Sequence, residues 1–206
     1  NISSKFGYWL IHISTDYVFD GKSTTPYSET DRVDPQNAYG FSKLKGELGI
    51  ISSECNYLIF RISWVFSEYG NNFLKNILKL GSSNKTLSIV GDQLGCPTYA
   101  QDFAKVIDIA LREIYNKKIQ SDLFHFCGDQ PCTWYDFSKY IFEEAEILGF
   151  KTPKSLISIS TEKYPTIAIR PLYSVLDCKK IKTSLKINLS NWRSGIKKAL
   201  LNIKLS

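Results

Sequence analysis

The hydrophobic pattern of this chain alternates between short apolar runs and longer stretches with helical spacing. Residues 8–13 form an apolar run of strand length, and residues 57–66 form a second one rich in β-branched and aromatic side chains. Shorter strands are predicted at 87–90 and 123–127. Helices are predicted at 38–53, 72–80, 101–115, 134–148 and 196–203, with Gly81 and Gly149 as the expected stops of the second and fourth. Strands that alternate with helices in this way predict a parallel α/β sheet.

Composition narrows the class of protein. At 206 residues the chain is long enough for one domain with a substantial core. It contains no run of about twenty apolar residues, which argues against a membrane span, and the expected location is cytoplasmic. Its five cysteines lack Cys-x-x-Cys spacing and its only histidines are His12 and His125. We therefore expect reduced, buried thiols and no metal site.

Basic residues gather in the C-terminal part. Twelve of the 26 lysines and arginines lie at or beyond Lys151, where the only acids are Glu162 and Asp177. Such a segment can attract nucleic acid, a membrane surface or the phosphates of a nucleotide, and a solvated Lys-rich face explains it equally well. No nucleic-acid motif with interleaved aromatic residues accompanies it, so we expect neither nucleic acid nor a membrane as a partner.

A Tyr and a Lys four residues apart carry the candidate chemistry. Tyr39 and Lys43 fall early in the predicted helix 38–53, so they share one helix face. A cation beside a phenol favours the phenolate and brings its pKa nearer to the pH at which general acid catalysis is efficient. Thr15, at the end of the first predicted strand, adds a hydroxyl group. Together the three groups suit proton transfer to or from a carbonyl oxygen.

The same Tyr-x-x-x-Lys spacing occurs a second time, at Tyr135 and Lys139. With 12 tyrosines in a Lys-rich chain, about one such pattern is expected by chance. Tyr39 follows a strand and a loop, whereas Tyr135 lies in the first turn of a helix that Thr133 would cap. We therefore predict that Tyr39 is the chemical copy and that Tyr135 is a packing residue.

Longer runs of sequence surround these residues. They include Ser14-Thr15-Asp16-Tyr17-Val18-Phe19-Asp20-Gly21, Tyr39-Gly40 with Ser42-Lys43, Arg61-Ile62-Ser63-Trp64-Val65-Phe66, Val90-Gly91-Asp92-Gln93-Leu94-Gly95-Cys96-Pro97-Thr98 and Asn191-Trp192-Arg193. In this order, and over almost the whole chain, they resemble the dTDP-4-dehydrorhamnose reductases, which are extended short-chain dehydrogenases/reductases. The resemblance implies an α/β fold: a partial Rossmann-like doubly wound parallel sheet with a smaller, discontinuous α/β substrate domain.

The chain departs from this family at the cofactor-binding turn. Members begin with a dinucleotide-binding βαβ unit whose Gly-rich turn approaches the pyrophosphate. Neither Gly-x-x-Gly-x-x-Gly nor Gly-x-Gly-x-x-Gly occurs here. By comparison with the family, the chain starts just before the fourth strand of the fold, so we expect either a truncation or a segment supplied by another chain. The preference between NADPH and NADH is not readable, because the selecting residue belongs to that segment.

The resemblance also implies a domain division and an activity. Residues 1–66, with about 100–127 returning, would form the C-terminal part of a dinucleotide-binding domain, and 67–99 with 128–206 the substrate-binding domain. The implied reaction is reduction of dTDP-4-dehydro-L-rhamnose to dTDP-L-rhamnose, with NADPH or NADH as cofactor, a dTDP-sugar as partner and a homodimer left open. The alternatives are a non-catalytic regulatory subunit, like the beta subunit of methionine adenosyltransferase, an epimerase or dehydratase of the same superfamily, or an inactive fragment.

Roles for individual residues follow from the chemistry and the resemblance together. Tyr39 would protonate the substrate C4 oxygen, Lys43 would lower the phenol pKa, and Thr15 would polarise the carbonyl. Tyr39 and Lys43 are also the expected cofactor contacts. The expected substrate-binding residues are Thr15, Asp16, Trp64, Asn72 and Arg170. The alternatives left open are a turn residue for Asp16, core burial for Trp64, helix capping for Asn72 and a surface ion pair for Arg170.

Overall fold

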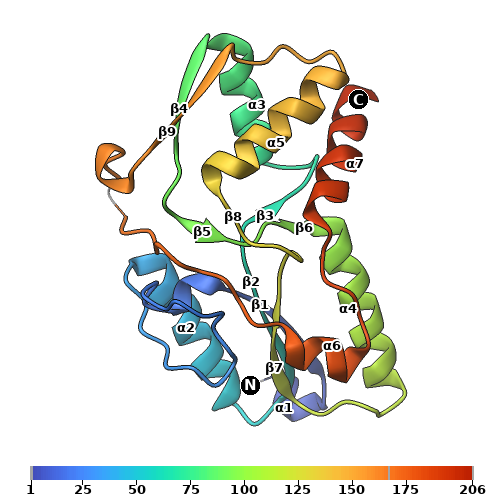
Figure 1. Cartoon of the computed structure of the whole chain (residues 1–206). Coiled ribbons are helices and arrows are strands. Elements are labelled where there is room, and N and C mark those ends of the chain that lie inside the picture. The colour runs from blue at the N-terminus through green and yellow to red at the C-terminus, as the bar shows by residue number, and fades with distance from the viewer. Residues whose placement is uncertain (1, 167, 206) are drawn as a thin grey trace.

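The computed structural model describes residues 2–166 and 168–205, and helices alternate with strands along most of the chain (Figure 1). The helices are α1 (Ile2–Phe6), α2 (Ala38–Ile51), α3 (Phe73–Ser83), α4 (Ala100–Tyr115), α5 (Trp134–Ile147), α6 (Lys179–Leu185) and α7 (Trp192–Leu205), with 3-10 turns η1 (Asp16–Val18) and η2 (Thr161–Lys163). The strands are β1 (Trp9–Thr15), β2 (Asn56–Ile62), β3 (Val65–Phe66), β4 (Thr86–Val90), β5 (Leu94–Gly95), β6 (Thr98–Tyr99), β7 (Asp122–Phe126), β8 (Cys132–Thr133) and β9 (Ser155–Ile159).

A parallel sheet of β1, β2 and β7, in the order β1-β2-β7, positions the site. Thr15 at the end of β1 lies beside Ile62 of β2, and Ile62 in turn lies beside Phe126 of β7. The carboxyl ends of these parallel strands therefore meet at one edge of the sheet, which is where ligands bind in open α/β sheets.

Helices cover both faces of this sheet, as in a doubly wound fold. Adjacent residues of a strand point to opposite faces. Arg61 of β2 reaches Glu47 of α2, with 2.9 Å between Nε and Oε1, whereas its neighbour Phe60 packs edge-on against Phe103 of α4. Helix α2 thus lies on one face and α4 on the other (Figure 1). The expected parallel α/β class is confirmed.

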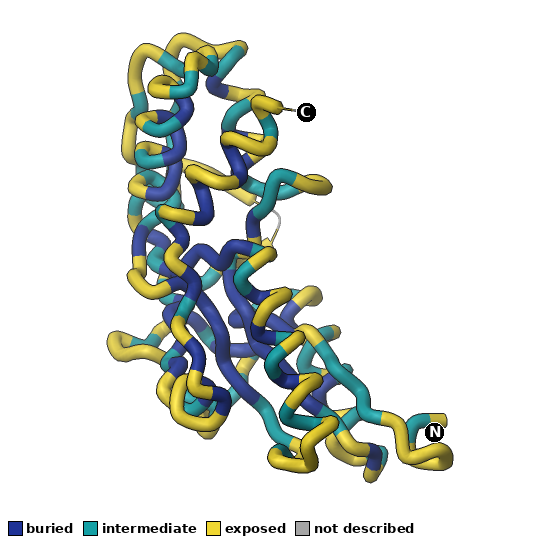
Figure 2. The backbone as a smooth tube through the Cα atoms, turned by 90° about the vertical axis from the view of Figure 1, so that its right-hand side faces the viewer, coloured by how far each residue is buried: buried dark blue, intermediate teal, exposed yellow. Residues whose placement is uncertain are grey.

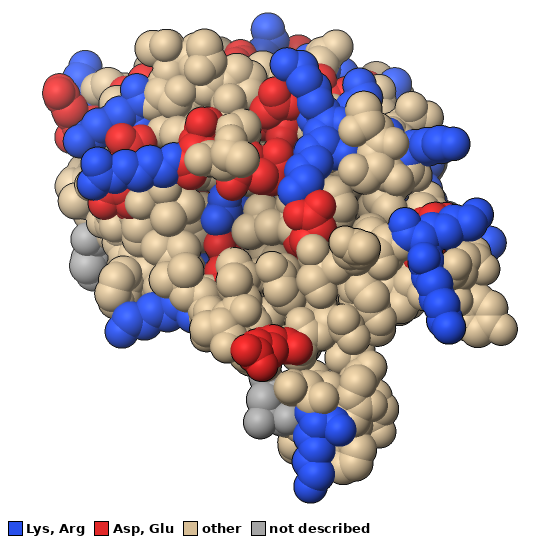
Figure 3. All heavy atoms as spheres, turned by 90° about the horizontal axis from the view of Figure 1, so that it is seen from below, with Lys and Arg blue, Asp and Glu red and all other residues tan. Residues whose placement is uncertain are grey.

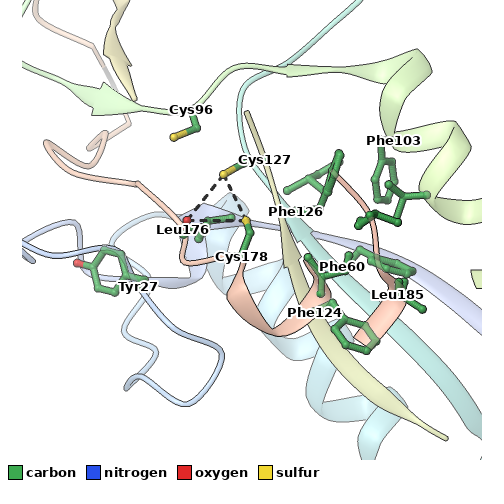
Figure 4. Packing of buried hydrophobic residues seen from close by; sticks show 14 of the residues in the cluster. Tyr27, Phe60, Cys96, Phe103, Phe124, Phe126, Cys127, Leu176, Cys178 and Leu185 are labelled. Atoms are coloured by element: carbon green, nitrogen blue, oxygen red, sulfur yellow. Dashed lines mark hydrogen bonds between the residues drawn. The ribbon is translucent and has the colours of Figure 1, made fainter. Parts of the chain in front are cut away.

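Two hydrophobic clusters form the core, and buried residues run through the middle of the molecule (Figure 2). The first packs the three-stranded sheet against α4 and α6, with Phe60, Phe124 and Leu185 among its members (Figure 4). The second joins α3, α5 and α7 around residues such as Phe137 and Trp192. Helix α6, which the hydrophobic pattern did not predict, returns from the C-terminal part of the chain to the first cluster.

The single strand predicted at 57–66 is wrong, because the chain breaks there into β2 and β3. β3 leaves the three-stranded sheet and pairs instead with β6. At the break, Trp64 has a φ of +47°, a left-handed conformation that cannot continue a strand. The unbroken apolar pattern hid a change of sheet at this residue.

The predicted stop of the second helix at Gly81 is also wrong, because α3 continues to Ser83. A Cβ atom at Gly81 would lie 2.3 Å from Cε1 of Phe142, which belongs to α5. Gly81 therefore allows α3 and α5 to approach closely and does not end the helix. Strand β9, in the segment without clear periodicity, was likewise not predicted, and it pairs in parallel with β4.

Other predicted features concern side chains rather than the fold. All five cysteines are unpaired and buried. Within residues 2–166 and 168–205, no group of three or more His, Cys, Asp or Glu side chains could hold a metal ion. None of the helices in that part of the chain is long and apolar enough to cross a membrane. Basic and acidic side chains are interspersed on the face seen from below (Figure 3). Among the ion pairs of the C-terminal part, Lys180 pairs with Asp122 and Lys179 with Asp177.

Candidate functional site

A cleft of about 650 Å³ lies at the carboxyl ends of β1 and β2, between the sheet and the helices α3 and α5. The structure brings all seven predicted site residues to its walls: Thr15, Asp16, Tyr39, Lys43, Trp64, Asn72 and Arg170. Thr15 and Arg170, the two of these residues that are most distant in the sequence, lie 155 positions apart, so the fold brings the seven together. The cleft is where the candidate chemistry must be sought.

Tyr39 and Lys43 enter the cleft from the first two turns of α2. Helix α2 starts at the cap residue Asn37, whose Oδ1 accepts a hydrogen bond of 2.9 Å from the N–H of Gly40. A Cβ at Gly40 would lie 2.1 Å from the carbonyl oxygen of Tyr17, so only glycine lets α2 approach η1 this closely. Tyr39 is 53% exposed, and Lys43 Nζ donates a hydrogen bond of 2.9 Å to the carbonyl oxygen of Ile13. Both polar ends therefore lie at the open side of the cleft.

Thr15 and Asp16 mark the point where β1 ends and η1 begins. Thr15 Oγ1 donates to Asp16 Oδ1 over 3.0 Å and accepts from the N–H of Tyr17 over 3.2 Å. Asp16 is only 3% exposed, and its second carboxyl oxygen, Oδ2, has no hydrogen-bond partner in the described part of the chain. Burial raises the pKa of Asp16 to about 7, against the opposing effect of the Ser174 and Thr15 hydroxyl groups.

The phenol of Tyr17 lies beside Asp16 and Tyr39. Its ring meets the ring of Tyr39 edge-on, with 5.9 Å between centroids and an interplanar angle of 81°. Burial raises the pKa of Tyr17 to about 12, and Asp16 adds to that shift while Arg170 opposes it. Tyr17 therefore stays neutral and serves as a wall of the cleft.

Trp64 lies at the break between β2 and β3 and stacks on Trp134, the first residue of α5. The two indole rings are parallel within 4°, with 3.5 Å between centroids. A Cβ at Gly95 would lie 2.4 Å from Cε2 of Trp64, so glycine there leaves room for the indole. Trp134 also touches Phe73, with 4.4 Å between ring centroids. An aromatic wall of three rings thus closes one side of the cleft.

Asn72 lines the cleft, but its side chain is engaged in capping. Its Oδ1 accepts from the N–H of Lys75, and its Nδ2 donates to the carbonyl oxygens of Ser67 and Tyr69 at 2.8 and 3.0 Å. The capping alternative is thus realised, and the amide holds the start of α3 against the preceding loop.

Arg170 reaches the cleft from the 168–177 segment, which crosses from η2 to α6. Neighbouring Pro171 packs against Gly21, where a Cβ would lie 2.4 Å from Pro171 Cβ and the φ is +76°. Asn37 Nδ2 donates a hydrogen bond of 2.8 Å to the carbonyl oxygen of Ile169. Arg170 is exposed and has no ion-pair partner within 4.0 Å among residues 2–166 and 168–205. The surface ion pair that the sequence left open as an alternative role for Arg170 is therefore not formed in this part of the chain.

A second cavity of about 330 Å³ continues from the cleft between α3, β4 and the segment around Tyr164. Its walls are mainly apolar, with Leu87 and Ile89 of β4 among them. Four residues line both cavities: Phe73, Asn76, Trp134 and Arg170. The cleft and the second cavity are therefore neighbours, and Arg170 borders both of them.

The second Tyr-x-x-x-Lys copy lies elsewhere. Tyr135 and Lys139 of α5 line a separate surface groove, and Lys139 Nζ lies 4.0 Å from Glu143. Neither residue borders the cleft or the second cavity. The structure therefore places Tyr39 and Lys43 at the cleft and Tyr135 and Lys139 away from it, and the chemical role of the first pair stays a prediction.

Three further residues of the cleft, Asn37, Asn76 and Trp134, were not predicted as site residues from the sequence. Asn37 could have been found as the cap before a helix that carries Tyr39. The other two depend on the packing of α3 and α5 beside the sheet, for which the linear pattern holds no signal.

Comparison with known proteins identifies the family. Residues 1–205 match the family model described as RmlD substrate binding domain. The chain belongs to the dTDP-4-dehydrorhamnose reductase (RmlD) family. Among curated relatives, the dTDP-4-dehydrorhamnose reductase of Sinorhizobium fredii is 40% identical over 195 residues, which cover 92% of this chain and 64% of the relative. The chain thus spans somewhat less than two thirds of that reductase, and the family resemblance drawn from the sequence is confirmed.

Solved structures of RmlD-family reductases share the fold. The dTDP-4-dehydrorhamnose reductase of Clostridium acetobutylicum superposes with a TM-score of 0.87 at 34% identity, covering 97% of this chain and 68% of that one. The Bacillus anthracis reductase, in complex with NADP, superposes with a TM-score of 0.85 at 30% identity and the same coverage. The Rossmann-like α/β architecture of the described part is therefore confirmed.

Proposed function

We propose that this chain takes part in the NAD(P)H-dependent reduction of dTDP-4-dehydro-L-rhamnose to dTDP-L-rhamnose, with Tyr39 as the proton donor. The observation that carries the proposal is the convergence of Tyr39, Lys43 and Thr15 on one cleft that Trp64 also lines. A phenol, an ammonium and a hydroxyl around one cavity are the groups that carbonyl reduction needs. Membership of the reductase family supports the same reaction.

The domain division expected from the family is part of this proposal. Residues 1–66 with about 100–127 would belong to the cofactor-binding domain, and 67–99 with 128–206 to the substrate-binding domain. The two hydrophobic clusters support it in outline, since one surrounds the three-stranded sheet and the other joins α3, α5 and α7. The return of α6 to the first cluster makes the second domain more intertwined than these boundaries suggest.

Tyr39 and Lys43 would hold the nicotinamide end of the cofactor, which supplies a hydride when bound. Their surroundings fit such a group, because β1 is the edge strand of the described sheet and Ile13, whose carbonyl holds Lys43, is 42% exposed. The Lys43 ammonium can then share its remaining hydrogens with a ribose hydroxyl. The sequence has no Gly-rich turn, so no residue of this chain is assigned to the pyrophosphate. The NADP complex of the Bacillus anthracis relative supports a nicotinamide cofactor.

In this reaction Tyr39 gives its proton to the substrate C4 oxygen while the carbonyl carbon receives the hydride, so the ketone becomes a hydroxyl group. Lys43 stabilises the phenolate that Tyr39 becomes. Thr15 donates a hydrogen bond to the same C4 oxygen as negative charge develops there. Asp16 lines the cleft next to Thr15 and would bind a sugar hydroxyl.

The remaining cleft residues would bind the rest of the substrate. The Trp64 face offers an apolar surface for the deoxysugar ring. Arg170 would bind the diphosphate, since it has no ion-pair partner among residues 2–166 and 168–205 and lines both the cleft and the second cavity. The second cavity would then hold the nucleoside. Asn72, whose side chain is occupied, would contribute through the backbone N–H groups at the start of α3.

Turnover of dTDP-4-dehydro-L-rhamnose with NADPH or NADH tests this proposal. Tyr39→Phe should lower kcat by about 100-fold or more, the usual contribution of a general acid. The matched control is Tyr135→Phe, in the other Tyr-x-x-x-Lys copy. This variant should have the same kcat as the wild type. Calorimetric binding of dTDP gives a second readout that needs no cofactor. Full turnover by Tyr39→Phe, or failure of the chain to bind dTDP, would overturn the assignment.

A further inference from the structure

The hydrogen bonds of Thr15 conflict with the role that carbonyl polarisation requires. A threonine hydroxyl has one hydrogen to donate and two lone pairs to accept. Here the hydrogen goes to Asp16 Oδ1, and one lone pair accepts from the N–H of Tyr17. Thr15 therefore has no hydrogen left for a substrate oxygen. It can polarise a carbonyl and keep its hydrogen bond with Asp16 only if the bond between Thr15 and Asp16 runs in the opposite direction.

Reversal of that bond requires a proton on Asp16, and the surroundings of Asp16 favour one. The carboxyl group is almost fully buried, and its Oδ2 has no hydrogen-bond partner in the described residues. Asp16 also lacks an ion-pair partner there, in contrast to Glu47, whose buried carboxylate is paired with Arg61 at 2.6 Å. An ionised carboxylate left buried without a cation is costly, whereas the neutral acid is not.

The groups around Asp16 do not supply the missing charge. Tyr17 of η1, Tyr39 and Lys43 of α2, and Arg170 of the 168–177 segment line the cleft together with Asp16, and the Ser174 hydroxyl interacts with the Asp16 carboxyl group. Tyr17 is a neutral phenol, because burial raises its pKa to about 12, and Ser174 is a neutral hydroxyl. Lys43 is bound to the carbonyl of Ile13, and neither it nor Arg170 lies within ion-pair distance of Asp16. The rise in the pKa of Asp16 to about 7, caused first by burial, agrees with this environment.

We propose that Asp16 acts in its protonated form as the positioning residue of Thr15, donating its carboxyl hydrogen to Thr15 Oγ1 and thereby freeing the Thr15 hydrogen for the substrate carbonyl oxygen. All three hydrogen-bonding capacities of the Thr15 hydroxyl are then used: it accepts from Asp16 and from Tyr17 N–H and donates to the substrate. The inference rests on the proposed reduction and deepens it.

The proton of Asp16 is not consumed in this scheme. Tyr39 supplies the proton that ends on the product oxygen, and Asp16 keeps its own throughout. When the pH rises and Asp16 ionises, the bond returns to the Thr15-to-Asp16 direction, and Thr15 withdraws its hydrogen from the substrate. A negative charge then also lies next to the oxygen on which charge develops. Both effects slow the reaction on the alkaline side.

Infrared spectroscopy of the 206-residue chain tests the protonation directly. The difference spectrum between the wild type and Asp16→Asn should contain the carbonyl band of a protonated carboxyl group at pH 6, and that band should fade as the pH rises past 7. No cofactor or turnover is needed for this measurement. If the band is absent at pH 6, Asp16 is ionised there and the proposal is overturned, whatever the fate of the proposed reaction.

The pH dependence of kcat tests the mechanism. The side-chain amide of Asp16→Asn can donate to Thr15 as the protonated acid does, so this variant should lose the part of the decline in kcat that begins near pH 7, while the decline caused by ionisation of Tyr39 remains. Asp16→Ala has no donor and should lose about 100-fold in kcat at every pH, as expected when an oxyanion donor is disabled. In a Thr15→Val background, Asp16→Asn should no longer alter the pH profile, whereas Thr15→Ser should restore it. Equal profiles for Asp16→Asn and Asp16→Ala would overturn the proposal, and lack of turnover by every form would count against the proposed reduction alone.

Discussion

The amide of Asn37 donates a hydrogen bond to the carbonyl oxygen of Ile169, 132 positions further along the chain. The same side chain caps α2 through its other end, accepting from the N–H of Gly40. One residue thus ties the helix that carries Tyr39 and Lys43 to the segment that carries Arg170. In the proposed function, placement of the substrate diphosphate by Arg170 would therefore be coupled to the position of Tyr39.

Replacement of Asn37 can separate these two contacts. Asn37→Asp keeps an oxygen for the cap but loses the donor to Ile169, so it should preserve the melting temperature and weaken dTDP binding about three- to ten-fold, the value of one hydrogen bond. Asn37→Ala loses both contacts and should also cost about 1 kcal/mol of stability. Calorimetry with dTDP and thermal unfolding measure the two effects. Asn84→Asp, at the end of α3, is the matched control, and wild-type binding by Asn37→Asp would contradict the coupling.

Two glycines of α2 offer a controlled test of the helix position. A Cβ at Gly40 would meet the Tyr17 carbonyl oxygen at 2.1 Å, whereas nothing lies within 4 Å of a Cβ at Gly49. Gly49→Ala should stabilise the protein by about 0.5–1 kcal/mol through helix propensity. Gly40→Ala should destabilise it by about 1–3 kcal/mol, because α2 must move away from η1. Urea unfolding measures both variants, and a stabilising Gly40→Ala would show that the contact is not rigid.

The stacked indoles of Trp64 and Trp134 should act as a unit. The left-handed backbone of Trp64 is strained, and the Trp134 face opposes any other placement of its ring. Trp134→Phe should abolish the exciton signal of the paired indoles in circular dichroism. It should also reduce the extra affinity of dTDP-L-rhamnose over dTDP by about two- to ten-fold, the value of an aromatic pair. Trp9→Phe, outside the cleft, is the control. If the sugar contributes as much affinity in Trp134→Phe as in the wild type, the wall does not position the sugar.

Ionisation of Asp16 should make the folded state less stable as the pH rises. Its pKa is about 7 in the folded protein, against an ordinary value of 3.8 for an aspartate in the unfolded chain, so the folded chain binds the proton more tightly. Stability is therefore greatest below about pH 4 for this group and falls until about pH 7, by up to about 4 kcal/mol. Asp16→Asn does not lose stability in this way. In urea unfolding, its free energy of unfolding minus that of the wild type should therefore increase from pH 5 to pH 8. Asp34→Asn, at an exposed loop carboxylate, should show no such growth, and a constant difference for Asp16→Asn would refute the prediction.

The sequence predicted those parts of the fold in which local pattern and tertiary structure agree. The apolar run before Thr15 and the helical stretch with Tyr39 and Lys43 agree with the structure, and the family resemblance supplied Trp64 and Arg170. The misplaced features depend on contacts between distant segments. Gly81 reads as a helix stop, yet Phe142 of another helix requires its small size. Trp64 reads as part of a strand, and only its stacking on Trp134 reveals why the backbone turns there.

The thiols described above also determine how the protein will react with electrophiles. All five are buried, burial raises the pKa of Cys132 to about 12, and the hydrogen bond with Cys127 raises the pKa of Cys178, with burial adding to the shift. Since thiolates are the reactive form, maleimides should label the native chain slowly. A cysteine introduced at exposed Thr166 would then be the fast-reacting thiol. A fluorophore attached to this cysteine would lie at the second cavity, and none of the native cysteines would have to be replaced.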